Sequence, residues 1–99
     1  MEHSKTIIEA IALRKCIMAT YNRMRVKLAP HVLYTRHDDL FVDAVTLERD
    51  GQPPREAKLG QFKLAGLSAV GFADRGFEPA DLLDLAEPRY DGTLLFAVE

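Results

Sequence analysis

The sequence predicts an α+β domain in which one N-terminal helix packs on a small five-stranded antiparallel β-barrel and an acidic C-terminal extension follows. Two observations carry this prediction. Helical periodicity is confined to the start of the chain, and the short apolar segments after it alternate with polar residues between tight turns. Because no long helix separates these segments, they favour an antiparallel meander over parallel crossover units. We place the helix at 4–14, the barrel at 15–74 and the extension at 75–99.

The helix is predicted from a four-residue repeat of apolar side chains. Thr6 and Glu9 have the spacing of a capping box, and Ile7 and Ile11 lie on one helical face. Arg14 suits the last turn, because a cation is stabilised at the negative end of the helix dipole. One short amphipathic helix is therefore expected.

Two strands joined by a polar turn follow the helix. Residues 16–21 are rich in strand formers, and residues 22–24 are polar. In residues 25–34 apolar positions alternate with basic ones, which indicates a half-buried strand with one basic face. Pro30 has no N–H for a sheet ladder, so the strand is expected to bend or bulge there.

Turn signals predict the rest of the barrel. Its remaining strands are expected at 40–48, 56–61 and 67–72. Asp50-Gly51 is a hairpin signal, Gly60 marks a possible bulge, and residues 74–76 are expected to stop the fifth strand.

The extension carries two further signals. Pro79 suits the first turn of a short helix through residue 85, and residues 93–98 are typical of a terminal strand. An apolar strand does not stay free in water. It is expected either to close against the chain's own sheet or to form a homodimer by adding to the sheet of a second copy.

Composition places the whole chain, residues 1–99, in the class of single globular domains. Its 99 residues are 47% apolar and 28% charged. No apolar run approaches the ~20 residues of a membrane helix, and no signal segment is recognisable, so we expect a cytoplasmic protein without a membrane partner. A single cysteine, Cys16, forms no internal disulfide and builds no four-ligand zinc site. The adjacent side chains of His37, Asp38 and Asp39 diverge on a turn, so we expect no metal and no cofactor.

Charge is divided unevenly along the chain. Residues 1–36 hold seven Lys or Arg against two Glu, which is +5, and the remainder holds six basic and thirteen acidic side chains, which is −7. The sum is the formal −2 of the whole chain. The basic first third is either a surface that faces an anion or ordinary solvated charge, and we weight the two interpretations equally.

Three polar residues invite a chemical interpretation. Asp43 lies in an otherwise apolar strand, where an ionised carboxylate is costly, so it is expected to point outward or to pair with a basic residue of the second strand. Nothing in the sequence places His31 beside Cys16, and no third group orients a base. Cys16 is expected to be a buried structural residue, and we expect no enzyme.

Five short stretches, taken in order, resemble the WYL-domain family, which is named for a Trp-Tyr-Leu triplet on a barrel strand. The matching stretches are Tyr21, residues 25–33 around Pro30, the triplet Leu40-Phe41-Val42, residues 57–62, and Phe77-Glu78-Pro79. The resemblance covers the chain from about Ile7 to Pro79. Members of the family resemble Sm-like or SH3-like barrels. They serve as ligand-sensing modules in bacterial transcription control and are thought to bind nucleotides or single-stranded nucleic acid.

The chain departs from the family pattern at informative positions. Leu40 stands in place of the Trp and Ala57 in place of a Phe, and Gly60-Gln61 replaces an Asp-Arg pair, which removes the most informative anion-contacting Arg. The helix-turn-helix that usually precedes such domains also has no counterpart before Cys16. The chain thus resembles a stand-alone, divergent module without its DNA reader.

The first function hypothesis is a non-catalytic regulatory module that binds a nucleotide or single-stranded nucleic acid. Its candidate ligand-binding residues are Tyr21, Arg25, Lys27, Phe41 and Lys58. Aromatic side chains offer stacking faces to bases and cations hold phosphates, and Lys58 matches a basic position of the family. For the aromatic residues, and for Tyr34 as well, core packing is the stronger alternative. The second hypothesis is a protein-interaction or self-association module that has lost the ligand site.

Overall fold

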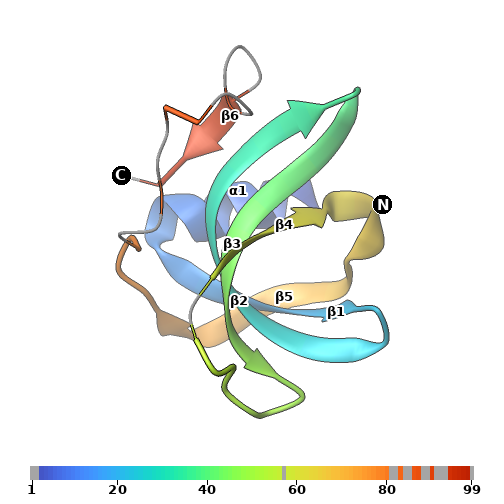
Figure 1. Cartoon of the computed structure of the whole chain (residues 1–99), viewed down its shortest axis with the longest axis vertical. Helices are drawn as coiled ribbons and strands as arrows, with labels where there is room; N and C mark the ends of the chain where they lie inside the picture. Colours follow the sequence, from blue (N-terminus) through green and yellow to red (C-terminus); the bar gives the residue numbers. More distant parts are fainter. Residues whose placement is uncertain are drawn as a thin grey trace.

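The computed structural model describes residues 3–56, 58–80, 83, 86–87, 90 and 94–98, which form a helix and an antiparallel sheet (Figure 1). The elements in chain order are α1 (Ser4–Leu13), β1 (Lys15–Tyr21), β2 (Met24–Arg36), β3 (Asp39–Arg49), β4 (Leu59–Lys63), the 3-10 turn η1 (Leu64–Gly66), β5 (Ser68–Gly76) and β6 (Leu94–Ala97). The α+β class expected from the sequence is confirmed.

Helix α1 begins earlier than the capping-box pattern indicates. His3 is the N-cap and makes no side-chain capping bond, so Thr6 already lies inside the helix and the capping box expected for Thr6 and Glu9 is wrong. The end of α1 agrees with the sequence, because Arg14 adopts a left-handed conformation (φ 55°) and its N–H bonds to carbonyl oxygens of the last turn.

Three tight turns have the left-handed conformations that short hairpins need. The residues are Asn22 and Arg23 (φ 50° and 65°), His37 and Asp38 (52° and 68°), and Asp50 and Gly51 (51° and 81°). The first two turns join strands in antiparallel register, β1 with β2 and β2 with β3. The predicted turn at Asp50-Gly51 is present, but it closes only a single bridge between Arg49 and Gln52 before β4 begins.

The register shows where the two expected bulges fall. The bulge predicted at Pro30 is confirmed, because the pairing of β2 with β3 shifts between Pro30 and Val32 and leaves His31 unpaired with β3. The bulge expected at Gly60 is wrong, since β3 and β4 pair without a shift. A Cβ on Gly60 would lie 3.4 Å from the ring of Phe62, so the glycine leaves room for that ring.

The last strands differ in length from their predictions. β4 begins and ends later than expected, and β5 runs through residues 74–76, which were expected to stop it. That expectation is wrong because Lys15 pairs with Gly76, so the exposed strand continues to pair with β1. The terminal strand expected at 93–98 is present as β6. The short helix expected at 79–85 lies largely outside the described residues.

The sheet is strongly curled. Its strand order is β4-β3-β2-β1-β5, with β6 pairing β2 off this path. In a flat sheet, four strand spacings of about 4.8 Å would place β4 and β5 about 19 Å apart. Only η1 and Leu67 connect them. The five steps from Lys63 to Ser68 reach about 18 Å when fully extended, and the 3-10 turn, with a rise of about 2 Å per residue, makes the connection shorter still. No ladder between β4 and β5 is recorded among the described residues, so the curled sheet is established and full closure is not.

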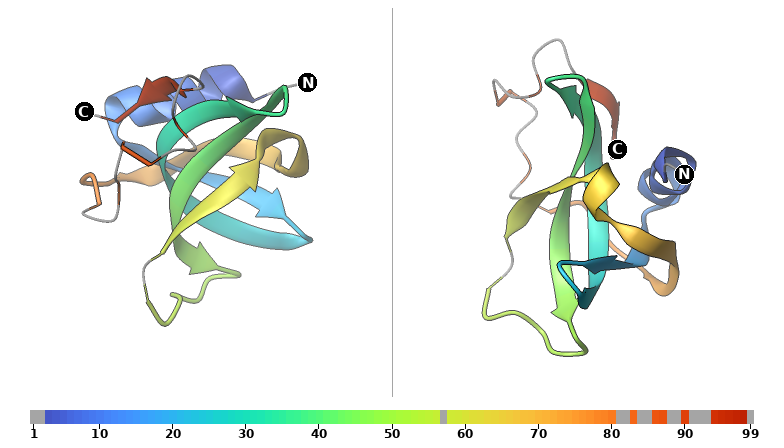
Figure 2. Two further views of the ribbon diagram at one scale, coloured as in Figure 1. Left: turned by 45° about the horizontal axis from the view of Figure 1, so that its top comes forward. Right: turned by 90° about the vertical axis from the view of Figure 1, so that its right-hand side faces the viewer.

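Each face of the sheet has its own cover (Figure 2). Helix α1 buries Ile7, Ala10 and Ile11 against one face, where the main core lies. On the other face, side chains of the C-terminal extension pack on two smaller clusters: Phe77 and Ala80 on the first, and Tyr90 within the second. The extension is therefore part of the folded domain at these positions.

Candidate functional site

The basic strand face predicted from the sequence is anchored at Arg25. Its backbone N–H donates to Asp50 Oδ1 at 3.0 Å. Its guanidinium Nη1 donates to the hydroxyl of Thr20 on β1 at 3.0 Å and to the carbonyl oxygen of Ala69 on β5 at 3.1 Å. The side chain is exposed, and no ion pair is recorded for it within the described residues. A charged guanidinium is thus held in one orientation at the surface by neutral partners.

Further charged residues lie at the same end of the sheet as Arg25. Lys27 shares its strand face and pairs with Glu48 of β3 at 3.2 Å. Arg49 pairs in register with Val26, so it lies at this end but its side chain starts from the other face of the sheet. We call the whole set the hairpin cluster: Arg23, Arg25, Lys27, Glu48, Arg49 and Asp50. Four cations against two carboxylates give it a formal charge of +2.

The other predicted site residues lie elsewhere. The ring of Tyr21 packs edge-on against Phe62 at 5.0 Å, among the residues of the main core. Phe41 pairs with Tyr34 near the far end of β2, and Lys58 is exposed and paired with Glu56 at 3.5 Å. The structure therefore brings Arg25 and Lys27 together and does not bring the two aromatic rings to them.

Tyr34 follows the core-packing alternative. Its side chain is fully buried, and its ring stacks on Phe41 with centroids 6.0 Å apart. A ring in this position offers no exposed face for a nucleic-acid base.

Asp43 does not follow either expectation for it, outward exposure or pairing with a basic residue of the second strand. It is fully buried, and its Oδ1 accepts a hydrogen bond from the hydroxyl of Tyr34 at 2.7 Å. Oδ2 accepts from the hydroxyl of Tyr90, and Gln61 Nε2 donates to the Tyr34 oxygen at 2.6 Å. Both expectations are therefore wrong: tyrosine hydroxyls satisfy the carboxylate. Sequence reasoning missed Tyr90 because the two positions are 47 residues apart.

His31 and Cys16 are both buried near the start of the extension. Burial lowers the pKa of His31 below 6.5, although a bond to the Ala29 carbonyl and the charge of Asp43 oppose the shift. Burial also raises the pKa of the Cys16 thiol above 9.0. No hydrogen bond between the two is recorded among the described residues, so they form no nucleophile and base pair.

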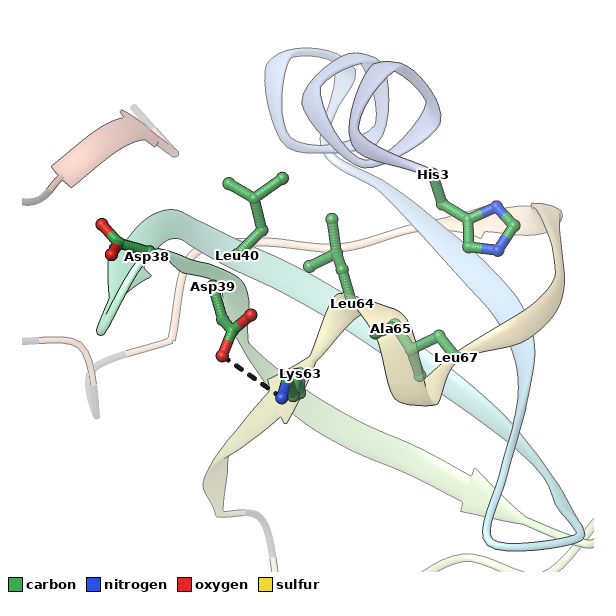
Figure 3. A pocket seen from close by; sticks show the side chains of 8 residues that line it. All are labelled: His3, Asp38, Asp39, Leu40, Lys63, Leu64, Ala65 and Leu67. Carbon is green, nitrogen blue, oxygen red and sulfur yellow. Dashed lines mark ion pairs between the residues drawn. The ribbon is translucent and has the colours of Figure 1, made fainter. Parts of the chain in front are cut away.

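A pocket of about 420 Å³ opens at the opposite end of the sheet from the hairpin cluster (Figure 3). It lies between the start of α1, the turn before β3 and η1, and Asp39 pairs with Lys63 at its edge at 3.2 Å. Asp38 and Asp39 outnumber Lys63, so the formal charge of the lining is −1 with His3 neutral. This pocket does not suit an anion.

The described residues hold no metal-ligand cluster, no membrane-spanning helix and no unsatisfied buried polar side-chain atom. No group of three or more His, Cys, Asp or Glu is placed to hold a metal ion. No helix in the described part of the chain is long and apolar enough to cross a membrane. Every buried side-chain nitrogen or oxygen described has a hydrogen-bond partner. In the comparisons with known proteins, no family model, curated protein or solved structure matches the chain.

Proposed function

We propose that the chain is a divergent relative of the WYL module with an SH3/Sm-like barrel, and that it binds an anionic ligand at the hairpin cluster without catalysing a reaction. The ligand class is a nucleotide or a short single-stranded nucleic acid, and the module serves transcription control in the cytoplasm. The helix-first order and the short η1 connection between the outermost strands support the barrel.

The observation that carries this proposal is the anchoring of Arg25. Hydrogen bonds to Thr20 and Ala69 fix the guanidinium without neutralising it. A cation that is already oriented loses less side-chain entropy when it binds a phosphate. The charge of +2 at the hairpin cluster contrasts with the −1 of the pocket, so the cluster is the better anion site of the two.

The test is a fluorescence anisotropy titration with a labelled oligothymidylate of about 12 nucleotides, with unlabelled ATP as a competitor. The double variant Arg25→Gln, Lys27→Gln is expected to bind more weakly. Its slope of log affinity against log salt should fall by about 0.7 for each lost phosphate contact. Arg36→Gln removes an exposed cation at the other end of β2 and is the matched control. Equal binding by the double variant and the wild type would refute the site.

A second candidate function is self-association through β6. Leu94 and Leu95 of this strand are 39% and 54% exposed, although they lie in a strand that pairs only with β2 in the described pairings. An exposed apolar edge strand is a template for pairing with another chain. Sedimentation velocity of Leu95→Glu against the wild type tests it. A wild type that is monomeric throughout the concentration series would exclude a homodimer.

A further inference from the structure

His31 is held in one neutral tautomer. It lies at the bulge of β2, with only 1% of its surface exposed. Nε2 is 2.9 Å from the backbone nitrogen of Ala80, and because a backbone N–H only donates, Nε2 must be the acceptor. Nδ1 therefore carries the proton and donates it to the carbonyl oxygen of Ala29 at 2.7 Å.

Residues 77–80, which we call the strap, lie over the apolar cluster next to His31. The ring of Phe77 is 5.0 Å from the imidazole, and the N–H of Phe77 donates to the carbonyl of Arg14 at 2.9 Å. Phe77 and Ala80 pack on this cluster, whose buried members are Cys16, Ala29, Val45 and Ala73. The hydrogen bond of Phe77 and the ion pair of Glu78 both go to Arg14 at the start of the strap. At the end of the strap, Ala80 is held by the imidazole nitrogen and by apolar packing.

We propose that the strap is a pH-sensitive cover: it is closed while His31 is neutral, and it opens when His31 takes up a proton from solvent, which exposes the apolar cluster and the Cys16 thiol. This inference is independent of the proposed anion site. Protonation converts Nε2 from an acceptor into a donor that faces the N–H of Ala80. Two donors in contact lose the hydrogen bond, and the new charge is buried.

Three ionisable groups lie around His31 or on the strap, and each affects the protonation or opening differently. Asp43 of β3 is the charged group whose field favours the protonated ring, but burial outweighs it. Cys16 of β1 belongs to the covered cluster and stays protonated as a thiol. Glu78 of the strap is exposed and pairs with Arg14 at 3.5 Å, so it stays in water in both states. Val98, which follows β6, donates its N–H to the His31 carbonyl at 2.7 Å and contributes no titratable group.

The size of the response follows from the burial of the ring. Opening returns His31 to water, where its pKa is the ordinary value of 6.5. Between the lowered pKa of the closed state and this value, the ratio of open to closed molecules rises by about tenfold for each unit that the pH falls.

The experiment measures the rate at which Cys16 reacts with 4,4′-dithiodipyridine, which stays reactive towards thiols in acid, between about pH 5 and pH 8. The thiolate is the reacting form and its fraction falls in acid, so each rate is divided by the rate of the urea-unfolded chain at the same pH. This normalised wild-type rate is expected to rise as the pH falls below 6.5. In His31→Gln an amide oxygen can accept from Ala80 but does not titrate, so its rate should lack this rise. His37→Gln, at an exposed turn, is the matched control and should behave as the wild type. A normalised wild-type rate that does not rise in acid, or an equal rise in His31→Gln, would overturn the proposal.

A second measurement distinguishes opening of the strap from unfolding of the whole domain. It uses the wild type alone, so it remains valid if His31→Gln does not fold. Protection from amide exchange, which is the intrinsic exchange rate at each pH divided by the rate observed by NMR, should fall in acid at Phe77 and Ala80 of the wild type and not at Val42 in the main core. The midpoint at Ala80 should match the titration of the His31 ring. An equal loss of protection at all three amides would show unfolding of the whole domain and would contradict a local cover.

Discussion

The hydroxyl of Tyr90 donates a hydrogen bond to the fully buried carboxylate of Asp43, and this bond joins the C-terminal extension to the middle of β3. The second Asp43 oxygen accepts from Tyr34, which lies beside it on β2. A buried carboxylate is costly unless it is hydrogen-bonded, and here both oxygens have a hydroxyl donor. The extension thereby supplies the second hydrogen-bond donor that the buried carboxylate of Asp43 requires.

Replacing Tyr90 with Phe tests the weight of this bond. Tyr90→Phe keeps the ring and removes the donor to Asp43, so the free energy of unfolding should fall by about 1.5–3 kcal/mol, the range for hydrogen bonds to charged groups. Urea unfolding followed by circular dichroism measures it. Tyr21→Phe is the control, because its partly exposed hydroxyl has no recorded partner, and a change within about 0.5 kcal/mol is expected. Equal effects of the two substitutions would contradict the assigned role of Tyr90.

Two glycines of β5 are expected to respond differently to alanine. A Cβ on Gly71 meets nothing within 4 Å, whereas a Cβ on Gly76 lies 3.2 Å from the carbonyl oxygen of Arg14. Gly71→Ala should therefore raise the free energy of unfolding by about 0.4–1 kcal/mol through the unfolded chain. Gly76→Ala should be the less stable of the two, because the connection between α1 and β1 must shift. Thermal melts of both variants decide the order, and the reverse order would show that this close approach does not limit residue 76.

Strand β6 is expected to stabilise the domain. Truncation before Leu94 removes Val98, which is 8% exposed, together with its N–H bond to the His31 carbonyl and the packing of Phe96 on the main core. Burial of a large apolar side chain contributes about 1.5–3 kcal/mol, a large share of the stability of so small a domain. The truncated chain should melt at a clearly lower temperature. A melt that matches the full chain would mean that β6 adds no stability.

Stability is expected to depend on pH through His31. Because burial lowers its pKa in the folded state below the ordinary 6.5, the unfolded chain binds more protons between these two values. The contribution of neutral His31 to the free energy of unfolding should be complete above pH 6.5. It should decrease as the pH falls towards the lowered pKa of the folded state. Urea midpoints of the wild type and His31→Gln across this window measure the effect. A similar slope in both would assign the pH dependence to other groups.

Local patterns in the sequence predict much of this fold. The turn after Tyr21 and the missing N–H of Pro30 each act within a few neighbours, and both appear as expected. The alternation expected over residues 25–34 holds only for residues 25–28, because residues 28–34 are buried without interruption and His31 lies in the interior instead of on the basic face. The continuation of β5 through residues 74–76 was not predictable in this way. Turn-forming residues can stay in a strand when a neighbouring strand pairs with them, and that neighbour, Lys15, is distant in the chain.

The candidate site divides along the same line. Arg25 and Lys27 share a face because strand side chains alternate with a period of two, which the sequence shows directly. The position of Tyr21 against Phe62, and of Tyr90 against Asp43, depends on how the sheet curls and where the extension crosses it. No local pattern encodes these contacts. The sequence therefore predicted a groove lined by aromatic and basic residues, whereas the structure has a basic cluster and packs Tyr21 against the core.

The most direct test of the central claim is an NMR titration of isotope-labelled protein with the same oligothymidylate. Binding at the hairpin cluster predicts that the largest amide shifts occur in the described segments around Arg25, Glu48 and Ala69, which surround the anchored guanidinium. The shifts should shrink as salt is added, because phosphate contacts weaken with ionic strength. Shifts confined to the pocket around Leu40 and Lys63, or no shifts at low salt, would contradict an anion site at Arg25.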